Sequence, residues 1–222
     1  NGREGGRIGN RHPYRAPQGC YPAQGQDQWI TLSVGSDAQW QALCATMGRE
    51  ELVADPRFAN LLARRRHHDQ IDEIVSGWTT QHDKYDLMHL LQGAGIPAGP
   101  VLTGKDVHFD PQYQSRGFLE RVTYPEHRGM GTRIIMGRPY KFSRTPLSVR
   151  GPAPAYGQDN QRLLTELLGV EDAAYQKLVQ DSIVASVPLP GEPVPRIPPE
   201  ESVEKGLMAA WDPDYRERLD IL

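Results

Sequence analysis

Residues 29–48 read WITLSVGSDAQWQALCATMG and join a strand signal directly to a helix start. Apolar and polar side chains alternate over residues 29–34, which is typical of a half-buried strand. Gly35 ends that strand, and Ser36 and Gln39 have the spacing of a capping box, which satisfies free N–H groups where a helix begins. Apolar residues then recur at helical spacing: Trp40, Leu43, Cys44 and Met47. A strand followed at once by an amphipathic helix predicts a mixed α+β fold.

Further elements follow this stretch along the chain. Apolar side chains at helical spacing predict one helix over residues 61–81 and another over 83–93. Residues 95–101 (GIPAGPV) predict a stiff loop, because two prolines fix φ there. Residues 118–124 and 132–136 predict two strands joined by a loop that contains glycine. We expect the helices to bury these side chains: Trp40, Leu43, Ile71, Ile74, Trp78, Met88 and Leu91.

Composition divides the chain into parts that differ in how well each folds alone. The division has an extended arm over residues 1–28, a small α+β domain over 29–125, a strand and linker over 126–157, C-terminal helices over 158–185 and a proline-rich tail over 186–222. We expect residues 188–199 to adopt polyproline II and to wrap a surface. An amphipathic helix over residues 158–168 leaves four leucines without a partner in the chain: Leu163, Leu164, Leu167 and Leu168.

Composition also narrows the class of protein. Hydrophobic residues are 38% and charged residues 24% of the 222, as in soluble globular proteins. No apolar run approaches the ~20 residues of a membrane span, so we expect no membrane contact. The pI of about 6.2 argues against a nucleic-acid partner. Two cysteines, Cys20 and Cys44, are too few for a disulfide framework and favour a reducing, cytoplasmic location.

Charged residues and possible ligands offer few specific signals. Six basic residues and no acidic one lie between Arg128 and Arg150, so this stretch faces either a phosphate or acidic partner, or solvent. The group of His67, His68, Asp69 and Asp72 is the densest set of possible metal ligands. Zinc usually takes three or four ligands from more than one segment, so we expect no metal site.

Short blocks in a fixed order resemble the class III CoA-transferase family, which includes formyl-CoA and carnitine-type CoA-transferases and the related alpha-methylacyl-CoA racemase. Each block alone is common, but their order over roughly residues 8–169 is specific. The blocks are IGNRHP (8–13), APQGCY (16–21), the strand that begins at Trp29, DPRF (55–58), GIPAGPV (95–101), DPQ (110–112) and GQDN (157–160).

The resemblance implies a reaction that moves CoA from an acyl-CoA donor to a carboxylic acid through enzyme-bound acyl intermediates. Family members are longer than this chain, with a Rossmann-like large domain, a small α+β domain and two interlocked chains. Their nucleophilic aspartate and most of their CoA contacts lie in an N-terminal half that nothing here matches. The expected partner is therefore a companion chain or N-terminal half bearing the Rossmann-like domain, completed by the extended linkers and C-terminal helices of this chain.

Several expectations about chemistry follow from the same resemblance. Coenzyme A enters as the acyl-CoA substrate, with no metal, and the isolated chain is inactive because it holds no catalytic residue. In formyl-CoA-type members, glycines after a Gly-Asn pair form a loop that closes over the acyl intermediate. Here Gly9 and Asn10 are followed by Arg11, His12, Pro13 and Tyr14, so the loop chemistry differs. We expect Gly9, Asn10, Arg11, His12 and Tyr14 to lie near substrate.

Within that loop, two side chains have specific expected roles. Arg11 is expected to pair with a substrate carboxylate. His12 is expected to hydrogen-bond an acyl oxygen or to carry a proton.

Two alternatives to CoA transfer stay open. One is racemisation at the carbon alpha to a thioester, by acid and base groups that also lie upstream. The other is a non-catalytic subunit that binds a partner and shapes its site. A nucleophilic aspartate in the companion half favours transfer, whereas a paired histidine and aspartate there favour racemisation.

Overall fold

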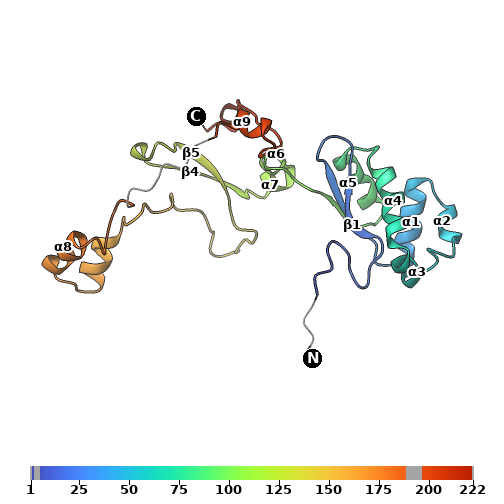
Figure 1. Ribbon diagram of the computed structural model, residues 1–222, viewed down its shortest axis with the longest axis horizontal. Coiled ribbons are helices and arrows are strands. Elements are labelled where there is room, and N and C mark those ends of the chain that lie inside the picture. Colours follow the sequence, from blue (N-terminus) through green and yellow to red (C-terminus); the bar gives the residue numbers. More distant parts are fainter. Residues whose placement is uncertain (1, 3–5, 189–196, 222) are drawn as a thin grey trace. The chain divides into compact units, whose positions relative to one another are not determined.

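The computed structural model describes residues 2, 6–188 and 197–221. It divides the chain into two compact units, residues 1–104 and 105–222 (Figure 1). The sequence predicts a small domain that extends to residue 125, whereas the first unit ends at Gly104. The difference arises because the last strand of the first unit's sheet ends at Pro100, and residues 105–125 pack within the second unit.

An antiparallel sheet forms the centre of the first unit. Its middle strand is β2 (Trp29–Ser33), which pairs with β1 (Gln18–Pro22) on one side and β3 (Ala98–Pro100) on the other. Ile30 and Leu32 of β2 are buried, while the alternate side chains of the strand are exposed or half-buried. The predicted alternation is confirmed, and it shows that one face of this sheet is covered.

Helices of the first unit supply that cover. They are α1 (Asp37–Met47), α2 (Glu51–Ala54), α3 (Leu61–Arg66), α4 (His68–Thr79) and α5 (Lys84–Gly93). At the start of α1, the Ser36 hydroxyl accepts a hydrogen bond from the Gln39 N–H at 3.2 Å. The Gln39 side-chain oxygen in turn accepts from the Gly35 N–H at 2.8 Å, one residue earlier than in a standard capping box.

The core of the first unit contains most of the side chains that helical spacing predicts. Of the expected set, Trp40, Leu43, Ile71 and Leu91 are buried. Three more are half-buried and pack against the same core: Ile74, Trp78 and Met88. The core prediction is therefore confirmed in its position and in its fully buried members.

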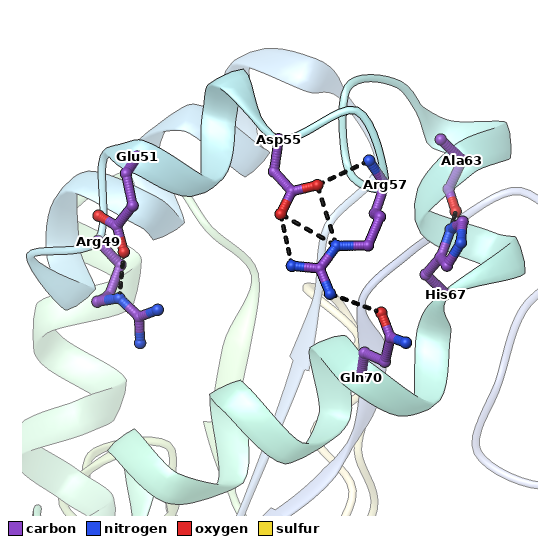
Figure 2. Close-up of polar contacts among 7 residues, drawn as sticks. All are labelled: Arg49, Glu51, Asp55, Arg57, Ala63, His67 and Gln70. Atoms are coloured by element: carbon purple, nitrogen blue, oxygen red, sulfur yellow. Dashed lines mark hydrogen bonds and ion pairs between the residues drawn. The ribbon is translucent and has the colours of Figure 1, made fainter.

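The turn between α2 and α3 is built by one charged pair. The Asp55 carboxylate accepts hydrogen bonds from the Arg57 backbone N–H at 2.8 Å and from its guanidinium Nη2 at 2.6 Å (Figure 2). Arg57 Nη1 also donates to the Gln70 side-chain oxygen on α4 at 3.3 Å. The turn directs Phe58 into the core. There its ring and that of Trp40 pack edge to face, with ring centroids 5.8 Å apart. The DPRF block is thus structural in this fold.

Several local predictions are wrong. The single helix expected over 61–81 is two helices, separated at His67, whose backbone (φ −111°, ψ 28°) is not helical. The His67 ring Nδ1 lies 2.9 Å from the Ala63 carbonyl oxygen at this break (Figure 2). The expected arm contains β1 and the expected loop over 95–101 contains β3, because pairing with β2 orders both segments.

The second unit is built around a hairpin. Strands β4 (Leu119–Thr123) and β5 (Thr132–Met136) pair antiparallel, which confirms both predicted strands. Its helical segments are α6 (Gly104–Phe109), α7 (Pro111–Ser115), η1 (Glu126–Arg128), η2 (Arg162–Leu167), α8 (Asp172–Gln180), α9 (Pro199–Glu204) and α10 (Tyr215–Arg218). The predicted helix over 158–168 has a π-helical segment, η2, with wider turns than an α-helix.

Few apolar side chains of the second unit are buried. Among its described residues, 105–188 and 197–221, the buried hydrophobic side chains are Val122 and Ile221. Leu167 and Leu168 are 71% and 68% exposed, as expected. Leu164 is half-buried and η2 contacts α8, so the expectation that all four leucines lack a partner is wrong for Leu164. The polyproline prediction for 188–199 falls largely on residues 189–196, outside the described residues. Within the described chain, no helix is both long and apolar enough to cross a membrane.

Candidate active-site loop

The predicted substrate loop is an exposed segment with a fixed root. Gly9, Asn10, Arg11, His12 and Tyr14 are all exposed. The chain becomes buried directly after them: the Ala16 N–H donates to the Val34 carbonyl at 3.1 Å, and the Pro17 carbonyl accepts from the Val34 N–H at 2.8 Å. These bonds fasten the end of the loop to the segment that follows β2.

A buried arginine also holds the end of the loop at Ala16 in place. Arg64 of α3 is fully buried and donates from Nε to the Ala16 carbonyl at 2.9 Å. It also donates to the Phe58 carbonyl at 3.2 Å and to the Asp37 carboxylate at 2.7 Å. A guanidinium with donors in several directions suits this position, because each bond satisfies a group from a different segment.

Arg11 is held by two carboxylates of α4. Its Nη2 donates to Asp69 Oδ1 and, at 2.8 Å, to Asp72 Oδ2. The two carboxylates are three residues apart and so lie on one face of the helix. The hydrogen bond to Asp69 raises the pKa of Arg11, and the same bond lowers the pKa of Asp69. Any substrate carboxylate must therefore compete with these two partners for Arg11.

A second layer of contacts lies beneath this pair. The Tyr21 hydroxyl of β1 donates to Asp72 Oδ1 at 2.7 Å, and burial raises the pKa of Tyr21. His68 Nε2 accepts from the Gln18 N–H at 3.3 Å, so the neutral ring carries its proton on Nδ1. Burial lowers the pKa of His68, although the Asp72 carboxylate, whose Oδ1 lies 3.5 Å from Nε2, acts in the opposite direction. His67, His68, Asp69 and Asp72, the possible metal ligands of the sequence, thus make other contacts. The described residues show no group of three or more side chains able to hold a metal ion.

His12 has a defined orientation within the loop. Its Nδ1 accepts a hydrogen bond from the Tyr14 N–H at 3.1 Å. The His12 and Tyr14 rings pack edge to face, with ring centroids 5.8 Å apart. In the neutral imidazole the proton then sits on Nε2, which makes that nitrogen a donor. The structure thereby gives His12 the donor that an acyl oxygen or carboxylate needs.

Beside the loop lies an open pocket of about 260 Å³. It is lined by Ile8, Arg11, His12, Pro13, Arg65 and His68. Sequence reasoning placed Arg11 and His12 near substrate but missed Arg65 and His68, and also the carboxylates that bind Arg11. The only local indication of a site was the run of charged and histidine residues over 64–69. The sequence does not show which residues they contact, because the contacts come from the distant N-terminal arm.

Comparison with known proteins gives a consistent result for most of the chain. A model of CoA-transferase family III matches residues 1–160. Succinyl-CoA–D-citramalate CoA-transferase of Chloroflexus aurantiacus is 31% identical over 166 residues, which are 75% of this chain and 40% of that protein. Succinate–glutarate CoA-transferase of Agrobacterium fabrum is 33% identical over 177 residues, with 78% and 42% covered.

A solved structure agrees with the sequence relatives. The crystal structure of a CAIB/BAIF family protein from Brucella suis superposes with a TM-score of 0.59 at 29% identity. The match covers 75% of this chain and 41% of that one. The mixed α+β fold is therefore shared with a solved protein, and the chain spans about two fifths of the length of these curated relatives.

Proposed function

This chain belongs to CoA-transferase family III, and we propose that it is the small-domain part of an acyl-CoA:carboxylate CoA-transferase. The family match over residues 1–160 is the observation that carries the proposal. The substrates are an acyl-CoA and a carboxylic acid. Covalent catalysis divides the transfer into successive acyl-transfer steps at an aspartate carboxylate, each easier than one direct displacement.

The aspartate belongs to a part of the enzyme that this chain does not contain. The chain spans only 40% and 42% of two curated relatives, which leaves most of their length unmatched. We place the Rossmann-like domain, with the nucleophile and most CoA contacts, in an N-terminal half or a companion chain. The exposed leucines of η2 support a partner there, because each buried leucine is worth about 1.5–3 kcal/mol. The assembly is an interlocked dimer or a heteromer located in the cytoplasm.

The loop over residues 9–14 closes the mouth of the active site in this proposal. Arg11 is fastened to α4, so it holds the loop against the small domain as well as adding positive charge. His12 Nε2 is available to donate to a substrate oxygen, because Nδ1 already accepts the Tyr14 N–H. Coenzyme A enters as acyl-CoA, and no step requires a metal ion.

The names of the relatives suggest the class of acid. The two curated relatives above are named for succinyl-CoA, D-citramalate, succinate and glutarate, and citramalate, succinate and glutarate are all dicarboxylates. Formyl-CoA:oxalate CoA-transferase of Streptomyces coelicolor, 26% identical over 182 residues, is named for another. We propose a dicarboxylic acid as acceptor and its short acyl-CoA as donor.

The test is reconstitution of the complete enzyme. With the remaining half supplied, the assembly should transfer CoA from succinyl-CoA to glutarate, while the isolated chain should not. Replacing Arg11 or His12 with alanine should lower turnover and leave the thermal midpoint within a few degrees. His89→Ala, an exposed histidine of α5 away from the loop, is the matched control.

Two results would contradict the proposal in different ways. Full activity of both loop variants would reduce the loop to a tether. Epimerisation of an alpha-branched acyl-CoA without CoA transfer would replace the transferase with the racemase alternative.

A further inference from the structure

The open pocket beside the loop has an unusual distribution of charge. Its described lining contains two guanidiniums and two imidazoles, from Arg11, Arg65, His12 and His68, and no carboxylate. Arg11 is already bound by the carboxylates of Asp69 and Asp72, which approach from α4. The Nε2 atom of His68 already accepts the Gln18 N–H, so it offers no hydrogen bond donor to the pocket.

Arg65 is different from the other cation of the lining. It lies in the last turn of α3, is exposed, and finds no hydrogen-bond acceptor or ion-pair partner among the described residues. Its neighbour Arg64 is fully buried and donates hydrogen bonds to Ala16, Phe58 and Asp37, and Arg66 is exposed but does not line the pocket. Of three consecutive arginines, only the middle one therefore presents an available guanidinium to this space.

The other donor of the pocket is His12. Its Nδ1 accepts the Tyr14 N–H, so Nε2–H is free to donate. Arg65 lies on α3 and His12 lies in the N-terminal arm. Although they are far apart in sequence, both line the same pocket. A guanidinium and a neutral donor together match a carboxylate, which accepts several hydrogen bonds at once.

The apolar residues of the pocket and its volume limit the kinds of ligand that it can bind. Ile8 and Pro13 add apolar surface, which suits a short hydrocarbon segment. The volume of about 260 Å³ is below the ~300–1,000 Å³ of pockets that enclose drug-sized ligands, so it fits a small acid and not a whole acyl-CoA.

We propose that this pocket binds the remote carboxylate of a dicarboxylic acid, with Arg65 as the residue that selects a dicarboxylic over a monocarboxylic acid. The inference rests on the proposed function, because it concerns the acid that receives or carries the acyl group. Arg65 forms the ion pair, His12 Nε2 donates a second hydrogen bond, and Arg11 stays with α4 to hold the loop that closes one wall.

A phosphate of coenzyme A is the other small anion that such a site accepts. The apolar walls favour the acid, since a phosphate of CoA brings no hydrocarbon segment with it. The experiment therefore measures the two ligands separately.

Calorimetric titration of the complete enzyme tests the inference without depending on turnover. Succinate and butyrate are the probes, because they share a four-carbon chain and differ in the second carboxylate. In Arg65→Ala, succinate should bind about ten-fold to one hundred-fold more weakly, as expected for a lost charged hydrogen bond. Butyrate and CoA should change by less than about two-fold. Arg66→Ala is the matched control and should change none of the three, and Arg65→Lys should restore part of the affinity for succinate.

Four outcomes would overturn the inference. They are unchanged succinate binding in Arg65→Ala, equal weakening in the two alanine variants, weaker CoA binding with succinate unaffected, and no binding of succinate or glutarate by the unaltered enzyme. Turnover measured on the same preparations tests the proposed function separately. An enzyme that binds succinate through Arg65 but transfers no CoA would contradict the proposed function and leave the binding site intact.

Discussion

The two units of the chain differ in how they satisfy their apolar side chains. Residues 1–104 bury a core that includes Trp40, Phe58 and Ile71, each at most 2% exposed. In the described part of residues 105–222, only Val122 and Ile221 are buried hydrophobics, while Leu167 and Leu168 are about two thirds or more exposed. The difference shows that the residues that stabilise the fold of the chain and the apolar residues that remain exposed lie in different units. The first unit has what it needs to fold, whereas the second carries surface suited to another polypeptide.

The largest expected contrast is between the two units expressed separately. Residues 6–104 should unfold in one cooperative transition, because their core is complete without the rest of the chain. Residues 105–222 should show no cooperative transition, since the two buried hydrophobic side chains found among its described residues cannot offset the entropy of ordering the segment. Circular dichroism during urea and thermal unfolding measures both. A sharp transition in the second fragment would remove the distinction between the units.

The next contrast is between single residues of the two units. Trp40→Ala should lower the free energy of unfolding by about 3–5 kcal/mol, because the side chain is 2% exposed and packs against Phe58. Leu167→Ala should change it by no more than about 0.5 kcal/mol, because the side chain is already in water. Urea denaturation followed by fluorescence of the remaining tryptophans makes the comparison. Similar losses for both would mean that Leu167 is buried in solution.

A smaller effect is expected if the exposed leucines contact the proposed companion half. Leu168→Glu should leave the stability of the isolated chain unchanged and weaken its association with that proposed half by about ten-fold or more. Analytical ultracentrifugation of mixed halves measures the dissociation constant. Gln176→Glu adds one negative charge at an exposed position of α8 and controls for added negative charge. If both variants associate like the unaltered chain, Leu168 does not lie in the interface.

The smallest effect concerns the pH dependence of the first unit. Burial lowers the pKa of His68 in the folded state below its ordinary value of about 6.5. Its contribution to stability is therefore fully present above pH ~6.5 and is lost as the pH falls toward the lowered pKa, because the unfolded chain takes up the proton first. In His68→Gln the free energy of unfolding should fall less between about pH 7.5 and about pH 5.5 than in the unaltered protein. Identical slopes would show that folding does not change the pKa of His68.

Local patterns predicted much of the first unit. The alternation around Ile30 and Leu32, the cap at Ser36 and the helical stripe of α1 depend on residues close together in sequence, and each is confirmed. Strand β1 was missed because residues 18–22 (QGCYP) contain Gly19 and Pro22 and lack alternation. That segment becomes a strand through its pairing with β2, which no local pattern records.

The candidate site was predictable only in part, for the same reason. The family-like order of blocks pointed to the arm, but Arg11 and its carboxylate partners are 58 and 61 residues apart in sequence. Nothing in the composition of α4 indicates that Asp69 and Asp72 bind the arm and not a metal or solvent. Sequence alone also could not distinguish Arg65 from its two neighbouring arginines. Only the structure shows that Arg64 is buried and that Arg65 lines the pocket.

Arg64 also has a consequence for how fast the first unit unfolds. Its bonds reach residues 48, 27 and 6 positions away, at Ala16, Asp37 and Phe58. Two of these loops must close before their bonds form, so we expect the contacts to be absent or weak in the transition state for folding. Substituting Arg64 with methionine should then speed unfolding much more than it slows refolding, which stopped-flow kinetics can resolve. Because the same guanidinium also bonds the Ala16 carbonyl, its loss should shorten the lifetime of the folded first unit and loosen the attachment of residues 9–14 together.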